Sequence, residues 1–159
     1  MGNNKDEVQA DTLNKVKEYI AHTGFIILGT VSEDGMPAIR TIASFANDQL
    51  DIYFSTGKQS AKVGHIEANP HVTILFQNEG QELTTFKNVT YHGKAKIVSD
   101  KSGLEKGVQL LSDKNPWFKA TVEAGGLQGI SIFKVEPERV QYLDYSKGIG
   151  PAAIIDVLI

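Results

Sequence analysis

The hydrophobic pattern begins with the spacing of a helix. Val8, Leu13, Val16 and Ile20 are apolar and are separated largely by polar residues, so they would share one face of an amphipathic helix. A glycine follows shortly afterwards, as is common where a helix ends. We therefore predict a single helix over about residues 6–22.

The pattern then changes to that of β-strands. Residues 25–32 and 38–46 are rich in β-forming side chains, and segment 33–37 between them contains a glycine and a proline, which predicts a β-hairpin. After a polar turn at 47–49, residues 50–54 alternate between apolar and polar, as in a strand with one buried face. Three antiparallel strands are thus expected in the first part of the chain.

The rest of the chain continues with short strands and inserted helices. Strands are predicted at 71–76, 88–98, 130–135 and 140–145, and helices at 61–68 and 101–111. Gly93 within a strand pattern indicates a bulge or a close approach of another segment, and segment 136–138, which contains a proline, is interpreted as a turn. Residues 112–126 have no regular pattern, and residues 148–159 are unusually apolar for a free end.

This order of elements favours a mainly β fold. About six short strands, with helices inserted between them and no β-α-β alternation, are typical of an antiparallel barrel decorated by helices. Neither an internal repeat nor a low-complexity linker interrupts the chain, whose 159 residues have the length of one ordinary domain. We expect a single domain over residues 1–159.

Composition narrows the function classes. The chain contains no cysteine, which excludes disulfides, thiolate metal sites and cysteine nucleophiles and agrees with a reducing compartment, so a cytoplasmic location is expected. The formal charge of -3 and a pI near 5.8 argue against a general nucleic-acid binder, whose affinity depends on a basic face.

No targeting or membrane segment is expected. The start of the chain, Met1 to Glu7, is polar and has no apolar stretch behind a basic cap, unlike a signal peptide. The longest apolar runs, 25–28 and 152–155, are far shorter than the roughly 20 residues needed to cross a bilayer.

Arginine is scarce, and one arginine is a candidate ligand-binding residue. Of sixteen basic residues only Arg40 and Arg139 carry the planar guanidinium that suits a phosphate. Arg40 lies in the middle of a predicted strand, where it could form an ordinary cross-strand ion pair on the wet face of a sheet. The alternative hypothesis is that Arg40 binds an anion.

The loop at residues 55–62 favours the anion hypothesis. Its sequence, Ser-Thr-Gly-Lys-Gln-Ser-Ala-Lys, brings hydroxyls, backbone N–H groups and lysines to the start of a predicted helix, whose dipole attracts negative charge. It is not a Walker loop, because Ile52 replaces the required first glycine and Gln59 replaces the magnesium-binding hydroxyl. An ordinary solvated turn with Ser60 as helix cap remains the alternative.

Other chemistries have little support. The four histidines lie on different predicted elements without metal-ligand spacing, so no metal site is predicted. The serines lack the Gly-x-Ser-x-Gly motif of hydrolases, and no side chain stands out as a catalytic acid or base. Trp117 and Phe118 could plug the core or form an aromatic wall for a planar ligand, and the plug is the favoured interpretation.

Several segments, taken in order, resemble the pyridoxamine-phosphate-oxidase-like FMN-binding split barrels, in particular the small flavoproteins called general stress proteins. The similar segments are Gly29 to Pro37, the strand Ala38 to Ile42, the loop from Phe54 to Lys62, and Ile66 to Val72. The resemblance covers about residues 10–145. It implies a six-stranded antiparallel split barrel.

The resemblance also implies a cofactor and the residues that hold it. In this family the strand arginine and the serine and lysine of the following loop hold the FMN phosphate, which would here be Arg40, Ser60 and Lys62. Other family positions along the flavin match Thr41, Ile42, Ser55 and Thr56, and a polar residue of the second subunit matches Asn88. A homodimer with two FMN sites at its interface is therefore implied, and the apolar tail and the exposed-looking Tyr142 and Tyr145 would suit such an interface.

Four departures from the family bear on the substrate and on flavin binding. The full pyridoxamine phosphate oxidase keeps a lysine where this chain has Phe45, and an arginine and a histidine in its C-terminal tail, where this chain has neither. Ala61 replaces a second basic residue of the loop, and Leu143 replaces a tryptophan near the end of the last strand. We predict an FMN-dependent oxidoreductase that does not oxidise that vitamer; the alternatives are a flavin carrier or sensor, or a split barrel that binds haem or the deazaflavin F420.

Overall fold

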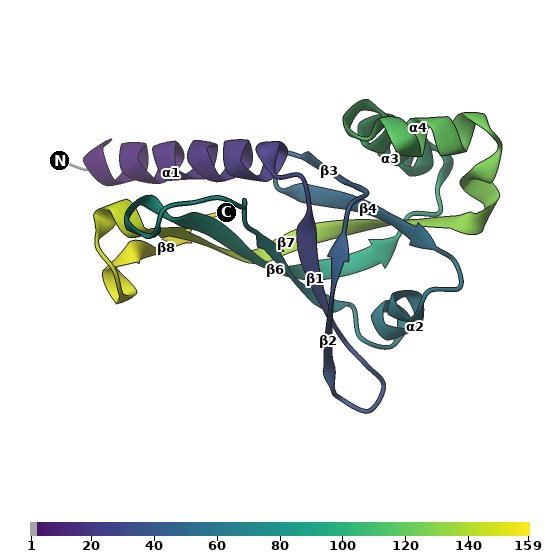
Figure 1. The fold of residues 1–159 in the computed structure, drawn as a ribbon, viewed down its shortest axis with the longest axis horizontal. Helices are drawn as coiled ribbons and strands as arrows, with labels where there is room; N and C mark the ends of the chain where they lie inside the picture. The colour runs from purple at the N-terminus through teal and green to yellow at the C-terminus, as the bar shows by residue number, and fades with distance from the viewer. Residues whose placement is uncertain (1–2) are drawn as a thin grey trace.

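One continuous antiparallel sheet organises the computed structural model, which describes residues 3–159, so the first two residues of the polar N-terminal segment lie outside it. The strands are β1 Ile26–Val31, β2 Pro37–Ile42, β3 Phe45–Asp48, β4 Asp51–Gly57, β5 His71–Phe76, β6 Lys87–Ile97, β7 Ile130–Asp144 and β8 Ile154–Val157. Their order is β2-β1-β5-β6-β7-β4-β3, with β8 paired to β7. The sheet curls into a half-barrel (Figure 1), so the prediction of a mainly β split barrel is confirmed.

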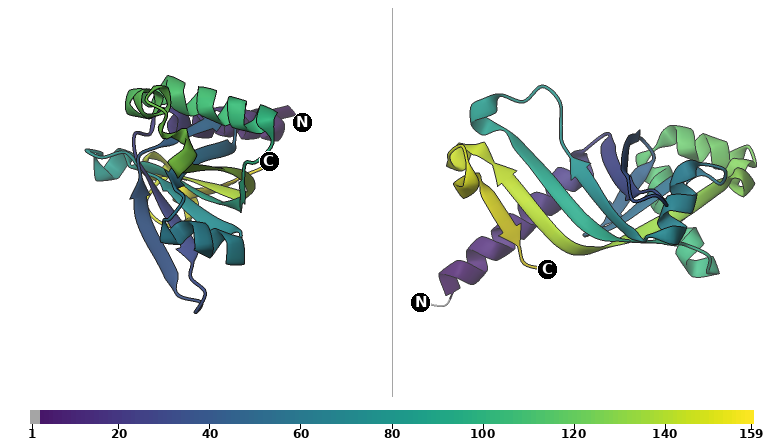
Figure 2. Two further views of the ribbon diagram at one scale, coloured as in Figure 1. Left: turned by 90° about the vertical axis from the view of Figure 1, so that its right-hand side faces the viewer. Right: turned by 90° about the horizontal axis from the view of Figure 1, so that it is seen from below.

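Four helices within residues 3–159 cover parts of this sheet. They are α1 Asn3–His22, α2 Ala61–Ala68, α3 Lys101–Lys114 and α4 Pro116–Glu123, and short 3-10 turns stand at Leu83–Thr85, Gly126–Gly129, Tyr145–Lys147 and Pro151–Ala153. Helix α1 lies along β6, β7 and β8, α3 and α4 lie beside β4 at the other end, and α2 lies near the hairpin of β1 and β2 (Figures 1 and 2). None of the described helices is long and apolar enough to span a membrane.

Alternation along the strands builds the core. Inward residues of β1 and β5, such as Leu28 and Ile74, are fully buried, and α1 contributes Val16 and Ile20 to the same cluster. A second, smaller cluster joins β4 and β7 to α3 and α4, with Leu111 and Phe118 at its centre. Of the two aromatic residues of this segment, only Phe118 plugs the core, since Trp117 is 53% exposed.

Several boundaries differ from the sequence prediction. Eight strands form instead of about six: residues 38–46 divide into β2 and β3, and the C-terminal tail is not free but supplies β8. Segment 136–138 is not a turn, because β7 runs through it without interruption. Segment 112–126, expected to be irregular, contains the last turn of α3 and all of α4, which begins with a proline in the first helical position.

The continuity of β7 depends on a bulge opposite Gly93. The register against β6 shifts between His92 and Gly93, and the proline at 137 is tolerated there because a bulge frees its position from donating a ladder hydrogen bond. A Cβ on Gly93 would overlap the carbonyl oxygen of Glu136 and lie 2.9 Å from the ring of Tyr91. The prediction of a bulge or close approach at Gly93 is therefore confirmed.

The bulge separates the barrel from a projecting part of the sheet, which we call the arm. The arm consists of residues 83–92 and 139–157, which include the start of β6, the end of β7 and all of β8, and α1 covers one side of it (Figure 1). Tyr142 is buried there and Tyr145 is half-buried, so the expectation that both tyrosines are exposed is wrong for Tyr142.

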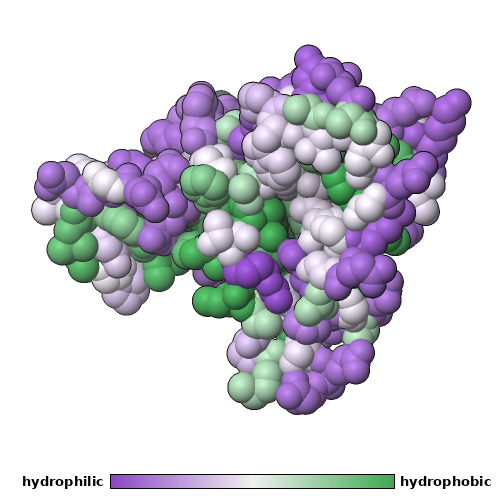
Figure 3. All heavy atoms as spheres, turned by 45° about the vertical axis from the view of Figure 1, so that its right-hand side comes forward, coloured by the Kyte–Doolittle hydropathy of each residue, from purple (hydrophilic) through white to green (hydrophobic). Residues whose placement is uncertain are grey.

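The opposite side of the sheet, which we call the open face, has no helix over it among the described residues (Figure 2). The strand register aligns the outward side chains of this face in two rows. One row consists of Ile27, Leu75, Thr90 and Gln141. The other consists of Asn88, Leu143 and Ile154. Ile27 is 39% exposed and Ile154 is 50% exposed. Apolar surface gathers where the arm meets the barrel (Figure 3).

Candidate functional site

Two parts of the chain come together at one edge of the sheet. Strand β2 is an edge strand, paired only with β1 among the described strands, and helix α2 begins immediately after β4 and its short loop. This arrangement gathers Arg40 of β2 with Ser60 and Lys62 at the start of α2. We call these three residues the cradle.

The Arg40 guanidinium is anchored at one nitrogen. Its Nη1 donates to Thr30 Oγ1 at 2.7 Å, to the carbonyl of Ala38 at 3.2 Å and to the carbonyl of Leu28 at 3.3 Å. No hydrogen bond from Nε or Nη2 to another described residue is found. The edge formed by Nε and Nη2 is the one that binds two oxygens of a phosphate side by side, and the anchor leaves that edge available.

The cross-strand ion pair considered for Arg40 does not form. The residue opposite Arg40 on β1 is Leu28, and within residues 3–159 no ion pair includes Arg40 or Lys62. The hypothesis that Arg40 forms an ordinary cross-strand ion pair on the wet face of the sheet is therefore wrong.

Lys62 adds a second cation to the cradle. Its Nζ donates to Ser60 Oγ at 2.6 Å. Partial burial lowers the pKa of Lys62, and the neighbouring charge of Arg40 lowers it further, while burial alone lowers the pKa of Arg40. Only the shift of Lys62 reflects the like charge of its neighbour, whereas the shift of Arg40 reflects the loss of hydration. An anion bound between the two groups would favour the charged form of both.

The start of α2 contributes backbone donors. Ser60 is the N-cap residue with extended backbone angles, and its hydroxyl makes no capping hydrogen bond. The helix therefore leaves N–H groups of its first turn unsatisfied by the cap, and these groups and the helix dipole both favour negative charge. The prediction of a helix over residues 61–68 is confirmed to the residue.

The other predicted cofactor residues lie in two places. Thr41 is exposed on β2 while Ile42 is buried, and as an edge strand β2 presents unpaired backbone groups on its outer side. Ser55 and Thr56 are buried at the end of β4, where the Ser55 hydroxyl shares a hydrogen bond with Ser44.

Asn88 is not brought to the cradle within one chain. It lies on β6, three strands away from β2 in the sheet order, and its Nδ2 donates to Gln77 Oε1 at 3.0 Å. Asn88 belongs to the open face, whereas Arg40 faces Leu28 and Thr30 on the inner side of the barrel.

Sequence reasoning missed two residues beside the cradle. Thr30 is 2% exposed and bridges Arg40 to His65 on α2, whose Nδ1 lies 2.9 Å from Thr30 Oγ1. Thr30 was visible only as part of a glycine-threonine motif at the end of the first strand. His65 was considered only as a metal ligand, and nothing in its sequence neighbourhood indicates a threonine partner 35 positions earlier.

Comparison with known proteins gives a consistent result. The family model described as Pyridoxamine 5'-phosphate oxidase matches residues 12–144. General stress protein 26 of Bacillus subtilis (strain 168) is 31% identical over 139 residues, which is 86% of this chain and 91% of that protein.

Solved structures share the fold at low sequence identity. A conserved hypothetical protein of Mycobacterium tuberculosis has a TM-score of 0.72 at 18% identity and covers 84% of either chain. HutZ of Vibrio cholerae, a haem storage protein, has a TM-score of 0.66 at 20% identity, over 80% of this chain and 91% of its own. These two likenesses show the split-barrel architecture alone.

Proposed function

Because this chain belongs to the pyridoxamine 5'-phosphate oxidase family, we propose that it is a flavoprotein that binds FMN and acts as an oxidoreductase. The single observation that carries the proposal is the cradle. Two cations, Arg40 and Lys62, lie in mutual electrostatic range without an ion-pair partner in residues 3–159.

The donor set fits a phosphate monoester. Arg40 offers a two-pronged edge, Lys62 offers a point charge, and Ser60 with the first N–H groups of α2 offers neutral donors. Such a mixture suits the terminal phosphate of FMN, which riboflavin lacks. The free edge of β2 at Thr41 and Ile42, together with Ser55 and Thr56, would then hold the flavin and ribityl parts.

The protein and the cofactor have separate tasks. When bound, FMN supplies hydride and electron transfer. The chain binds the phosphate through the cradle, orients the ring system along the edge of β2 and excludes water with the surrounding apolar residues. Phe45, which stands where the full oxidase keeps a lysine, is completely buried, so it offers no polar contact to a vitamer phosphate.

A homodimer completes this proposal. The open face presents exposed apolar side chains, among them Ile27 and Ile154, and an uncovered apolar sheet face favours pairing with an equal surface. Asn88 of the partner subunit would then approach the flavin bound by the first subunit. A cytoplasmic location also stays a prediction, based on the absence of cysteine.

The first experiment is a spectrum and a titration. Freshly purified protein should show the absorption of a flavin, or gain it when FMN is added, and FMN should bind at least about tenfold more tightly than riboflavin, as expected for charge-assisted hydrogen bonds. Equal binding of the two flavins would contradict the cradle assignment, and a haem Soret band in the purified protein would contradict the choice of cofactor.

Two further measurements test turnover and assembly. Anaerobic reduction of the bound flavin by NADH or NADPH, followed by reoxidation with added electron acceptors, separates an oxidoreductase from a carrier or sensor, which would not be reduced. Sedimentation at micromolar concentration should give a dimer, and dilution should lower the apparent affinity for FMN because binding and dimerisation are linked. A monomer that holds FMN tightly would contradict the shared site.

A further inference from the structure

The geometry points to Thr30 and His65 as positioning residues that fix the Arg40 guanidinium for phosphate binding. We propose that the Thr30 hydroxyl accepts a hydrogen bond from Arg40 and donates its own proton to Nδ1 of a neutral His65, whose proton is on Nε2. The positioning role rests on the proposed function, whereas the direction of the hydrogen bonds does not.

The first step concerns the contact between Arg40 and Thr30. It is the shortest of the three hydrogen bonds from Nη1, at 2.7 Å against 3.2 and 3.3 Å for the two carbonyls. A guanidinium has only donors, so Thr30 Oγ1 must be the acceptor. The hydroxyl proton of Thr30 is then free for another partner.

The second step assigns that proton. Thr30 is 2% exposed, so bulk water does not compete for its hydroxyl. His65 Nδ1 lies 2.9 Å from Thr30 Oγ1 and can accept only when it carries no proton, which places the proton of the neutral ring on Nε2. The three groups form a directed chain from Arg40 through Thr30 to His65.

The chain of hydrogen bonds connects the cradle to three elements of the fold. Its members come from β2, β1 and α2, and Lys62 lies one helical turn before His65 on the same helix. The contact between Thr30 and His65 therefore ties α2 to the sheet next to Arg40 and sets the separation of the two cations. At the same time it holds Nη1 against β1 and leaves Nε and Nη2, which make no hydrogen bond to a described residue, available to a ligand.

The test uses pairs of variants that differ only in the relevant hydrogen bond. Thr30→Val removes the hydroxyl and Thr30→Ser keeps it; His65→Leu removes the acceptor and His65→Asn keeps one near the position of Nδ1. Thr23→Val is the matched control, because Thr23 is also buried and its hydroxyl donates to the Tyr19 carbonyl at 2.7 Å, at the end of α1. Affinities for FMN and for riboflavin are measured for each variant.

A positioning role predicts a selective loss. Thr30→Val should bind FMN about 5- to 30-fold more weakly, less than the loss expected when Arg40 itself is removed, because the guanidinium stays and loses only one of its three anchoring hydrogen bonds. Riboflavin affinity should be unchanged. Thr30→Ser and His65→Asn should recover most of the FMN affinity, and Thr23→Val should match the wild type. Equal losses in Thr30→Val and Thr30→Ser, or none in Thr30→Val, would overturn the positioning role.

Nitrogen-15 NMR of the imidazole in the ligand-free protein gives an independent readout. Wild-type His65 should show an unprotonated Nδ1 and a protonated Nε2, and Thr30→Val should lose this fixed preference. A proton on Nδ1 in the wild type would overturn the proposed direction of the chain. If the wild type binds FMN and riboflavin equally, the proposed function fails and the positioning role with it, whereas a preference for FMN over riboflavin that is as large in Thr30→Val as in the wild type overturns only the positioning role.

Discussion

Within residues 3–159, Arg40 and Lys114 are partly buried cations without a carboxylate partner, and their surroundings stabilise the charge in opposite ways. In the cradle, Arg40 is fixed by three hydrogen bonds from one nitrogen and keeps its other edge available. At the end of α3, Lys114 Nζ is buried with no hydrogen-bond partner among the described residues and lies 3.4 Å from the centre of the Phe45 ring.

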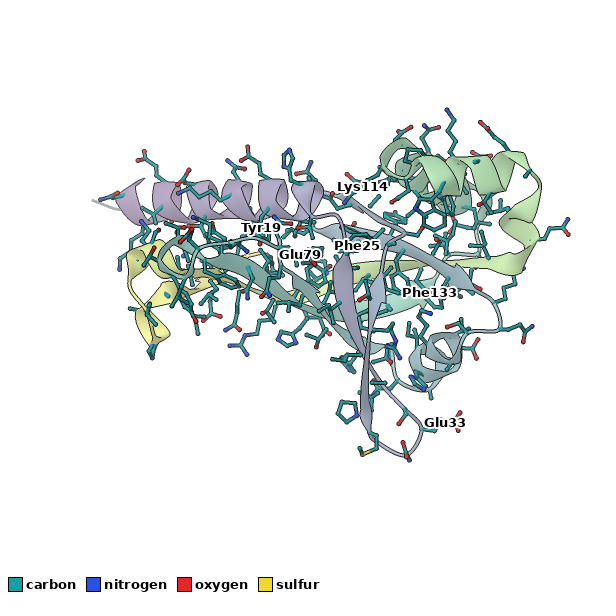
Figure 4. All side chains as sticks on the ribbon, in the orientation of Figure 1. Tyr19, Phe25, Glu33, Glu79, Lys114 and Phe133 are labelled. Carbon is teal, nitrogen blue, oxygen red and sulfur yellow. The ribbon has the colours of Figure 1, made fainter. Side chains whose placement is uncertain are left out.

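The difference lies in what each site offers the charge. The guanidinium is stabilised by oxygen atoms and remains partly solvated, and its pKa falls through burial alone. The amine of Lys114 has only the aromatic face as a partner, and burial lowers its pKa to about 8. Lys114 lies where the helices meet β3 (Figure 4), and Phe45 is fully buried beneath it.

The comparison teaches that a missing ion pair is not by itself a sign of a binding site. A cation that is anchored by neutral acceptors and open on one side can bind an anion with little rearrangement. A cation enclosed by apolar groups instead reduces the stability of the folded state, because its charged form has lost its hydration. We therefore assign a ligand to the cradle and none to Lys114.

The largest expected effect is on cofactor affinity in the cradle. Arg40→Ala should weaken FMN binding by about 1.5–3 kcal/mol, or roughly 10- to 150-fold, since it removes charged hydrogen bonds to phosphate. The midpoint of urea unfolding should change much less, because Arg40 forms no ion pair in residues 3–159. If Arg40→Ala instead unfolded the protein while the folded fraction kept its FMN affinity, Arg40 would have a structural role and not a binding role, and the contrast with Lys114 would be wrong.

The next effect is on stability at Lys114 and depends on pH. The pKa of Lys114 in the folded protein, about 8, lies below the ordinary lysine value of 10.5. Between these two values the unfolded chain binds more protons, so the free energy of unfolding rises with pH. The full shift is reduced by solvent screening because the side chain is only half-buried, and the expected gain is about 1–2 kcal/mol.

Lys114→Met checks this assignment. The variant should lack the rise in stability between pH 8 and 10.5 and should be at least as stable as the wild type at pH 7, as judged by urea denaturation. Its FMN affinity should not change. A variant that is less stable at every pH would mean that the contact with the Phe45 ring outweighs the lost hydration.

The smallest expected effect separates the two charges within the cradle. Lys62→Met should weaken FMN binding by about 3- to 10-fold, less than Arg40→Ala, because a lysine contributes one point charge and no two-pronged edge. The affinity of the wild type should fall with added salt more steeply than that of Lys62→Met. A larger loss in Lys62→Met than in Arg40→Ala would reverse the assigned roles.

Local signals predicted much of the fold. The helix at residues 61–68, which ends before Asn69-Pro70, and the hairpin of β1 and β2 follow from helix-ending residues, turn residues and β-forming side chains, which act over a few positions. β8 depends on pairing with β7 after two 3-10 turns, which no local pattern indicates. The Glu-Pro-Glu segment was misread because a proline signals a turn more often than a bulge in a long strand.

In the candidate site, too, the features set by nearby residues could be predicted and those set by long-range packing could not. Arg40, Ser60 and Lys62 could be selected because their charges and hydroxyls are scarce or clustered in the sequence. The partnership of Thr30 with His65 depends on how α2 packs against β1, and the burial of Lys114 depends on how α3 meets β3. Neither can be read from the neighbours of these residues in the sequence.

The covering of the arm by α1 also determines the order in which the protein can fold. Val16 of α1 shares the core with Val157 of β8, and Gln9 Oε1 accepts a hydrogen bond from the Leu158 backbone at 3.5 Å. During synthesis the apolar face of α1 can be fully buried only after β8 has been made. Such long-range closure is expected to slow folding relative to helical proteins, because the apolar face of α1 stays partly exposed until β8 has paired with β7.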